Sequence, residues 1–169
     1  MMAAQSAYGG GGGDGNLLMT YHTFHSEIWV PRPPAEVFAF FSDAHNLEQI
    51  TPPWVRFQVV TPAPIVMRAG TLIDYKIRVR RLSLKWRTEI TEWCPPERFI
   101  DTQLRGPYVR WEHTHSFTAR DGGTLCTDDV LYWPRGGFLA PLIHALFVRR
   151  DVEKIFAYRA KVLREKFGE

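Results

Sequence analysis

The chain has little of several features that mark particular protein classes. It holds two cysteines, Cys94 and Cys126, and no CxxC spacing, so no disulfide framework is expected. It has no long apolar run and no basic-then-apolar leader, which predicts neither a membrane span nor a secretory signal. The net charge is only +3, and the Lys and Arg residues are scattered, so no nucleic-acid partner is expected. These absences predict a reduced, cytoplasmic protein.

The composition that remains suits a single domain. Of the 169 residues, 45% are hydrophobic, enough for a sizeable core. Aromatic residues make up 14% and include six Trp, whose side chains line either a core or a pocket for an apolar ligand. Residues 1–19 contain the glycine run 9–13 and can bury almost nothing, so they are predicted to be a disordered tail. Residues 20–169 are predicted to form one domain without internal repeats.

The periodicity of apolar residues predicts an α+β fold. A first strand is expected over residues 20–30, and Pro33 and Pro34 suit the first turn of a short helix. Ser42 and Asp43 can cap a second short helix. Alternation then predicts six strands and a final helix, at residues 57–61, 71–80, 84–93, 98–105, 109–119, 124–133 and 138–167. A curved antiparallel sheet of about seven strands, wrapped around the long C-terminal helix, is the natural way to bury these faces.

The segment 103–117, QLRGPYVRWEHTHSF, carries the most unusual chemistry. The strand period of two places His113 and His115 on the face that apolar neighbours mark as the inner one. A three-residue turn then pairs Asp101 with His113 and Phe99 with His115. The predicted inner row is therefore partly polar.

The last strand adds a second carboxylate to this row. Asp128 falls beside His113 or beside His115, depending on a two-residue shift at the turn after residue 120. A carboxylate that orients a histidine and raises its basicity is what general base catalysis requires, whereas a polar network that satisfies itself only shapes a cavity. Two histidines and a carboxylate could hold a metal, but no cysteine joins them and no clustered motif supports a site, so no metal is predicted. The catalytic candidates are His113, His115, Asp101 and Asp128.

The order of the elements, with the motifs GPYVRWEHTHSF, GTLIDY, KWRTEI and VRRDVEKIFAYR, resembles the START/Bet v 1-like (SRPBCC) superfamily. Within it the chain is similar to the bacterial ligand-binding proteins grouped with polyketide cyclase/dehydrase and lipid-transport domains. The resemblance spans residues 21–167. It implies a helix-grip fold with a hydrophobic cavity between the curved sheet and the C-terminal helix, and no cofactor. Carriers, receptors, cyclases and hydrolases share this fold.

The leading hypothesis from the sequence is non-covalent binding of a hydrophobic or amphipathic small molecule, such as a lipid, isoprenoid or polyketide, by a carrier or sensor. The alternative is a cyclase, dehydratase or hydrolase that uses a histidine–carboxylate pair. Inward aromatic side chains and the polar inner row supply the predicted wall. The predicted ligand-binding residues are Tyr75, Trp86, Gln103, Arg105, Trp111, His113, His115, Phe117, Asp128, Tyr132, Phe156 and Arg159.

A basic hairpin lies outside the predicted cavity. A four-residue turn at residues 80–83 would set Arg78 opposite Lys85 and Lys76 opposite Arg87, all on the outer face. Like charges opposite each other destabilise a sheet, so the pattern suggests a patch for an anionic membrane or an acidic protein partner. A solvated face relieved by neighbouring acids is the alternative interpretation.

Overall fold

The computed structural model of the chain describes residues 21–79 and 82–168. The predicted tail and the tip of the basic hairpin, at residues 80–81, lie outside the described residues. The first strand, β1, covers His22–Val30. The elements after it are α1 (Pro34–Phe41), α2 (Asn46–Gln49), η1 (Pro53–Val55), β2 (Gln58–Val59), β3 (Leu72–Val79), β4 (Leu82–Cys94), β5 (Arg98–Arg105), β6 (Tyr108–Arg120), β7 (Gly123–Pro134), η2 (Gly137–Leu139), α3 (Ala140–Ile143), η3 (His144–Val148) and α4 (Arg149–Phe167).

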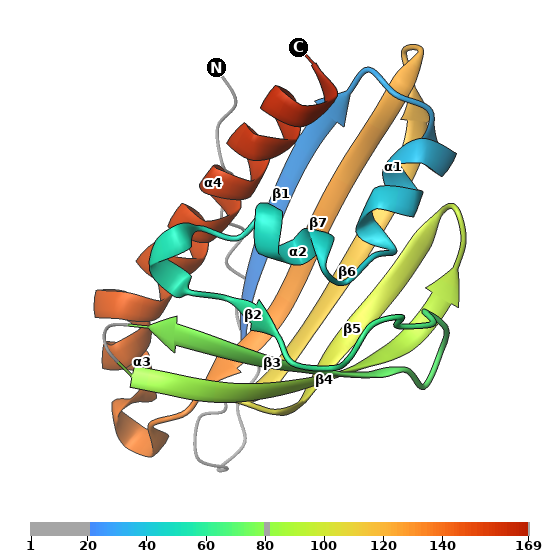
Figure 1. Cartoon of the computed structure of the whole chain (residues 1–169). Coiled ribbons are helices and arrows are strands. Elements are labelled where there is room, and N and C mark those ends of the chain that lie inside the picture. Colours follow the sequence, from blue (N-terminus) through green and yellow to red (C-terminus); the bar gives the residue numbers. More distant parts are fainter. Residues whose placement is uncertain (1–20, 80–81, 169) are drawn as a thin grey trace, which may run out of the picture.

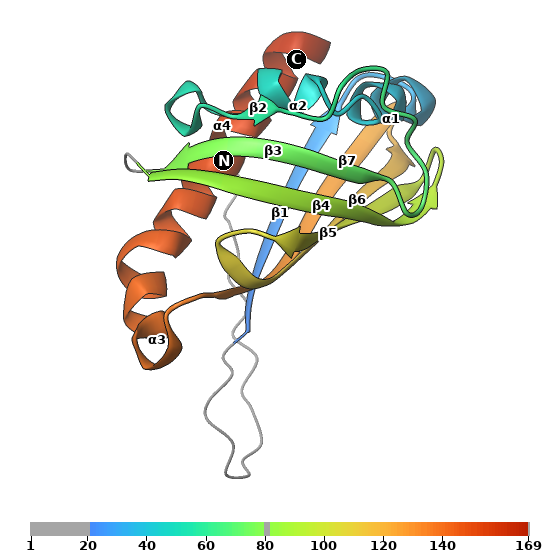
Figure 2. The same cartoon turned by 60° about the horizontal axis from the view of Figure 1, so that its bottom comes forward.

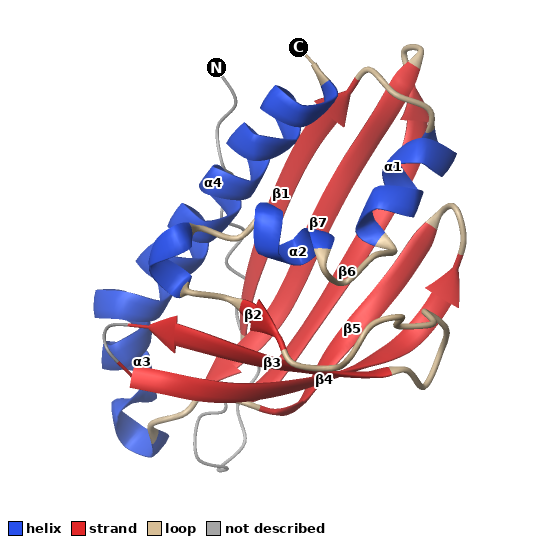
Figure 3. Cartoon of the chain, in the orientation of Figure 1, coloured by secondary structure: helices blue, strands red, loops and turns tan. Residues whose placement is uncertain are grey.

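The strands form one curved antiparallel sheet, which confirms the predicted fold class. Its order is β1-β7-β6-β5-β4-β3-β2 (Figures 1 and 3). The strands from β2 to β7 therefore lie in chain order, and β1 pairs with β7 at the edge opposite β2. Two register shifts interrupt the pairing of β4 with β5, near Thr88 and Thr91. Such bulges bend a strand and increase its twist, which explains how the sheet curls toward the helix (Figure 2).

No helix in the described part of the chain is long and apolar enough to cross a membrane.

The C-terminal segment is helical, as predicted, but it is not one uniform α-helix. Pro141 lies in the first turn of α3, where a missing N–H leaves no bond unmade. The departure from α geometry comes later, in the π turn of η3. α4 then runs beside β1 (Figure 1), and its Phe156 ring lies 4.6 Å from that of Phe24. This contact fixes the helix against one side of the sheet.

The first helix caps the other end of the curled sheet. Pro33 and Pro34 begin α1, and Val37 and Phe38 are its buried residues. The Phe38 ring meets that of Phe117 edge-on at 5.4 Å. Aromatic packing of this kind makes the region under α1 a solid core.

Two hairpins set the register of the polar inner row. β5 and β6 pair Asp101 with His113 and Phe99 with His115, as predicted. The β6–β7 turn places two residues in left-handed conformation, Asp121 at φ 50° and Gly122 at φ 75°. A tight turn of this kind sets His115 opposite Asp128.

The basic hairpin differs from its prediction, because only residues 80–81 separate its strands. The loop is two residues shorter than expected, so the register moves by two. Arg87 now lies opposite Asp74, to which its guanidinium donates two hydrogen bonds of 2.8 Å. The predicted pairs of Arg78 with Lys85 and Lys76 with Arg87 are therefore wrong. The observed pairs are Asp74–Arg87, Lys76–Lys85, Arg78–Ser83 and Val79–Leu82.

Candidate functional site

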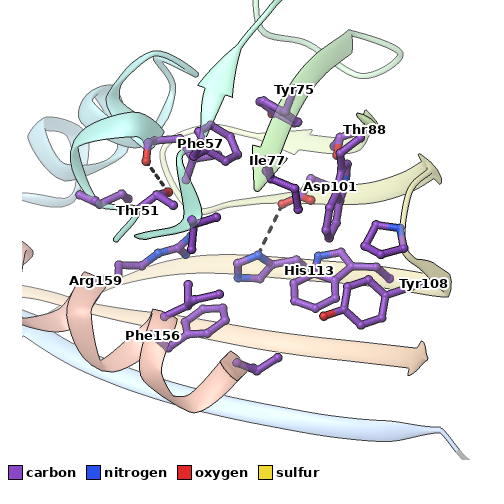
Figure 4. A pocket seen from close by; sticks show the side chains of 18 of the residues that line it. Thr51, Phe57, Tyr75, Ile77, Thr88, Asp101, Tyr108, His113, Phe156 and Arg159 are labelled. Carbon is purple, nitrogen blue, oxygen red and sulfur yellow. Dashed lines mark hydrogen bonds and ion pairs between the residues drawn. The ribbon is translucent and has the colours of Figure 1, made fainter. Parts of the chain in front are cut away.

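The curved sheet and α4 border a pocket of about 540 Å³. Figure 4 shows side chains of β3 and β4 on one side, such as Ile77 and Thr88, and Phe156 and Arg159 of α4 on the other. The sheet contributes Ile73, Tyr75, Ile77, Arg78, Leu82, Leu84, Trp86, Thr88, Ile90, Phe99, Asp101, Tyr108, Trp111, His113, His115 and Pro134. Most of these side chains are apolar or aromatic, so the wall suits an apolar ligand body.

Aromatic rings form a continuous part of this wall. The Trp86 and Trp111 rings meet edge-to-face at 5.4 Å, and Tyr108 contacts both, at 5.7 and 4.8 Å. The Trp86 indole N–H donates to the Thr88 hydroxyl at 3.0 Å, so its one polar atom is satisfied within the protein. Burial raises the pKa of the Tyr108 and Tyr75 hydroxyls, which therefore stay protonated at neutral pH.

Five ionisable side chains gather at one place, four in the wall and one directly behind it. We call Asp101, His113, His115, Asp128 and Arg159 the polar cluster. Hydrogen bonds join His113 Nε2 to Asp128 Oδ1 at 2.7 Å and His115 Nε2 to Asp101 Oδ2 at 2.8 Å. The Arg159 guanidinium reaches across from α4 and donates through Nη1 to the same Asp128 oxygen at 3.0 Å. The cluster thus links three strands to the helix.

The two histidine rings of the polar cluster stand between the two carboxylates. Their centroids are 3.7 Å apart and their planes differ by 35°. His113 Nδ1 lies 3.6 Å from Asp101 Oδ2, and His115 Nδ1 lies 3.1 Å from Asp128 Oδ1. The second contact lacks hydrogen-bonding geometry, and His115 Nδ1 has no hydrogen-bond partner among the described residues. Asp128 therefore contacts both histidines. It lies opposite His115 in the sheet and is hydrogen-bonded to His113, so each of the two predicted positions is partly correct.

The charges within the polar cluster oppose the effect of burial. Burial alone would raise the pKa of the Asp128 carboxyl, but Arg159 and the two histidines hold it well below its usual value. Asp101 behaves in the same way, with the hydrogen bond from His115 lowering its pKa against burial. Burial and the neighbouring His115 lower the pKa of His113, whereas the two carboxylates overcome burial and raise the pKa of His115. The two imidazoles of the cluster are thus unequal, with the pKa of His113 shifted down and that of His115 shifted up.

Of the predicted ligand-binding residues, seven line the pocket and five do not. Those in the wall are Tyr75, Trp86, Trp111, His113, His115, Phe156 and Arg159. Those outside it are Gln103, Arg105, Phe117, Asp128 and Tyr132. Among the catalytic candidates, Asp101 also lines the pocket, whereas Asp128 lies behind the two histidines.

Each of the other four side chains outside the wall has a visible reason for its position. Gln103 bonds the backbone of Tyr108 in both directions, at 2.9 and 3.3 Å, and so continues the β5–β6 pairing beyond its last backbone pair. Arg105 is exposed at the end of β5. Phe117 belongs to the core under α1. Tyr132 is buried against α4, and its hydroxyl bonds His144 at 2.9 Å.

Part of the pocket wall was not predicted. The end of α1 contributes Phe40 and Phe41, and the segment between α1 and β2 contributes Asp43, Ala44, Asn46, Leu47, Ile50, Thr51, Trp54, Val55 and Phe57. The sequence shows that most of these residues are apolar, but only the path of the loops determines whether their side chains face the pocket. Tyr108 was assigned to a turn; the structure makes it the first residue of β6, paired with Pro134. An aromatic residue directly before an alternating strand was the available signal.

Solved structures share this fold across nearly their whole length. TTHA0849 from Thermus thermophilus has a TM-score of 0.67 at 19% identity, covering 86% of this chain and 99% of its own. Major latex-like protein 151 from Panax ginseng has a TM-score of 0.65 at 8% identity, covering 88% and 99%. The ZhuI aromatase/cyclase from Streptomyces sp. R1128 has a TM-score of 0.62 at 13% identity, covering 86% and 95%. These likenesses show the fold.

At the level of sequence, the chain is similar to a family of proteins but to no single curated protein. No curated protein matches the chain. The profile of the family described as polyketide cyclase/dehydrase and lipid transport matches residues 30–158, which is most of the chain and includes the strands that carry the pocket wall. The chain therefore belongs to the polyketide cyclase/dehydrase and lipid transport family, within the SRPBCC superfamily.

Proposed function

We propose that the protein binds a hydrophobic or amphipathic small molecule, lipid-, isoprenoid- or polyketide-like, and acts as its carrier or sensor. The observation that carries this proposal is the pocket of about 540 Å³ with a largely apolar and aromatic wall. That volume lies within the range of small-molecule sites. The polar cluster gives the wall one place where an oxygen-bearing end of the ligand would orient.

Mass spectrometry of the protein as expressed tests this function. The protein is measured in its native state and again after denaturation, without added ligand. The expected result is a native spectrum that shows the protein plus the mass of a ligand. Denaturation should release that ligand chemically unchanged, since binding is non-covalent. An extracted lipid or polyketide-like compound would name the chemical class. Failure to retain any member of a panel of lipids, isoprenoids and aromatic polyketides would contradict the carrier function.

The second candidate function is catalysis of a cyclisation, dehydration or hydrolysis in the same pocket. It is favoured by the unequal histidines of the polar cluster: the pKa of His113 is lowered, which suits a proton acceptor, and the pKa of His115 is raised, which suits a proton donor. One relative in fold is an aromatase/cyclase. Turnover of a poly-β-ketone or aryl ester should fall at least tenfold in His113→Ala and His115→Ala. Turnover in both variants equal to that of the wild-type protein would exclude these two histidines as acid and base.

The third candidate is transient docking on an anionic membrane or an acidic protein through the β3–β4 hairpin. Lys76, Arg78 and Lys85 are exposed, whereas Arg87 is neutralised by Asp74. Leu82 lines the pocket and is still 67% exposed, so this hairpin lies where the pocket meets solvent. Flotation with phosphatidylserine vesicles should weaken as salt rises from about 50 to 500 mM, since the attraction is screened. Flotation independent of salt would contradict this mode.

We further propose that the protein works in the cytoplasm. Its two cysteines, exposed Cys94 and buried Cys126, are both free thiols. Unpaired cysteines are the normal state in a reducing compartment. A fusion to a fluorescent protein that is found outside the cytoplasm would contradict this location.

A further inference from the structure

Three atoms of the polar cluster converge from two strands on the pocket side. They are Asp101 Oδ2, His113 Nδ1 and His115 Nε2, which all lie within 4.8 Å of one another. The distances from Asp101 Oδ2 are 2.8 Å to His115 Nε2 and 3.6 Å to His113 Nδ1. Ligands about 2.1 Å from a metal ion in tetrahedral or octahedral geometry stand roughly 2.9 to 3.4 Å apart. Small side-chain shifts would bring all three atoms to those distances.

Asp128 completes the arrangement from behind. It is absent from the pocket wall, and its Oδ1 lies 2.7 Å from His113 Nε2 and 3.1 Å from His115 Nδ1. In both rings, then, the nitrogen farther from Asp101 lies next to this second carboxylate, and that of His113 is hydrogen-bonded to it. A carboxylate behind a ligating histidine fixes the ring and raises its basicity, which is the usual arrangement around a histidine metal site.

The charges also suit a cation. Arg159 is buried and pairs with Asp128 at 3.0 Å, so these two opposite charges compensate each other. Asp101 has no cationic partner of that kind among the described residues; its 2.8 Å hydrogen bond goes to His115, which holds a proton there when no metal is bound. Replacing that proton by a divalent ion would leave one carboxylate and two imidazoles as ligands. Imidazole and carboxylate without thiolate favour Zn²⁺ or Fe²⁺ over Ca²⁺ and Mg²⁺.

We propose that Asp101, His113 and His115 bind one divalent transition-metal ion, with Asp128 as their supporting carboxylate. From the sequence, two histidines and a carboxylate were considered as a metal site but no metal was predicted; what the structure adds is the convergence of the three ligand atoms within 4.8 Å of one another. Three protein ligands leave at least one coordination position, which would face the pocket. A metal ion there would polarise a carbonyl or hydroxyl oxygen of a bound ligand. The inference concerns metal binding itself and does not depend on the small molecule proposed above.

Titration of the tag-free protein with Zn²⁺ and with Co²⁺ tests the site. The expected result is one tightly bound ion per chain, with Co²⁺ giving visible d–d absorption typical of nitrogen and oxygen ligands. Asp101→Asn keeps the size of the side chain but removes the anionic ligand, so affinity should fall at least tenfold. His25→Gln is the matched control, because His25 contacts Glu27 and Asp129 in an exposed cluster that could bind metal adventitiously.

A measurement on the wild-type protein tests the metal site without depending on the folding of any variant. Zn²⁺ should shift the imidazole ¹⁵N resonances of His113 and His115 and leave those of His25 in place. Three results would overturn the proposal: no saturable binding by the wild-type protein, unchanged affinity in Asp101→Asn, or loss of binding in His25→Gln. Ligand retention is measured separately with the metal-free protein, so failure of the metal site and failure of the carrier function remain distinguishable.

Discussion

At the scale of single residues, one oxygen of Asp128 holds much of the polar cluster together. Asp128 Oδ1 accepts from Arg159 and meets both histidines, all within 3.1 Å. Removing one partner of a buried ion pair leaves the other charge uncompensated, which costs far more than the intact pair contributes. The polar cluster is therefore a place where a nearly isosteric change should have a large effect.

Asp128→Asn is predicted to lower the free energy of unfolding by about 3–5 kcal/mol, because the buried Arg159 guanidinium loses its carboxylate. Asp129→Asn is the matched control. Asp129 is the next residue on β7, but its side chain is 56% exposed and pairs with His25 on the surface, so it should cost at most about 1 kcal/mol. Urea unfolding measures both. Equal losses in the two variants would contradict the buried pair.

His144 is predicted to make the protein acid-sensitive. Burial, followed by the proximity of His22 and Arg149, lowers its pKa from 6.5 to about 4, while Glu153 opposes this weakly. Its ring stacks on that of His22 at 3.4 Å, and its Nε2 is hydrogen-bonded to the Tyr132 hydroxyl at 2.9 Å. The folded state thus binds the proton less tightly than the unfolded state, so stability present above pH 6.5 is lost as pH falls toward 4.

Chemical denaturation between pH 7 and pH 4 checks this dependence. The wild-type protein should lose stability across the window, and His144→Gln should lose less, because a glutamine does not titrate. Some loss should remain, since burial also lowers the pKa of His22. Parallel curves for the two proteins would show that His144 does not carry the effect.

At the scale of elements, the β6–β7 hairpin positions the polar cluster through two adjacent glycines. Gly122 has φ +75°, and a Cβ there would meet no described atom within 4 Å. A Cβ on Gly123 would lie 2.3 Å from the Val30 carbonyl oxygen and 2.7 Å from the Trp29 ring. Gly122→Ala should therefore cost only the left-handed strain of about 1–2 kcal/mol.

Gly123→Ala should cost more than Gly122→Ala, because β1 must move away from β7 to make room for the methyl group. Thermal unfolding of the two variants gives the comparison, with the wild-type protein as reference. A smaller loss in Gly123→Ala would mean that β1 does not approach the turn this closely.

Hairpins also show which parts of the fold and site could be predicted from the sequence. Asp-Gly favours a tight turn, so the position of the β6–β7 hairpin was predictable although its register was left open by two residues, and strand parity placed His113 and His115 inside. The β3–β4 loop has no residue that fixes its length, so its register was predicted two residues away from the observed one. Strand parity likewise placed Gln103 inside but could not show that its side chain bonds the Tyr108 backbone.

At the scale of the whole molecule, the pocket lies between the curled sheet and α4, while α1 and the end of α4 pack into the solid core beside it. Its wall draws on β3 to β7, on the C-terminal helical segment, on the end of α1 and on the segment between α1 and β2. Binding at such a site ties these elements together. A ligand that binds only the folded state stabilises it by about 2.7 kcal/mol at one hundred times its dissociation constant.

Filling the pocket should remove much of that stabilisation without unfolding the protein. Ile77 lines the pocket from β3, and Ile77→Trp would place an indole ring in the open space. With anilinonaphthalene sulfonate as an apolar anionic probe, affinity should fall at least tenfold. At the same probe concentration the stabilisation then drops from about 2.7 to about 1.4 kcal/mol. Leu72→Trp is the control, because Leu72 lies on the same strand but is 47% exposed and outside the wall. Fluorescence titration and thermal unfolding should agree, and equal binding by both variants would place the probe somewhere other than this pocket.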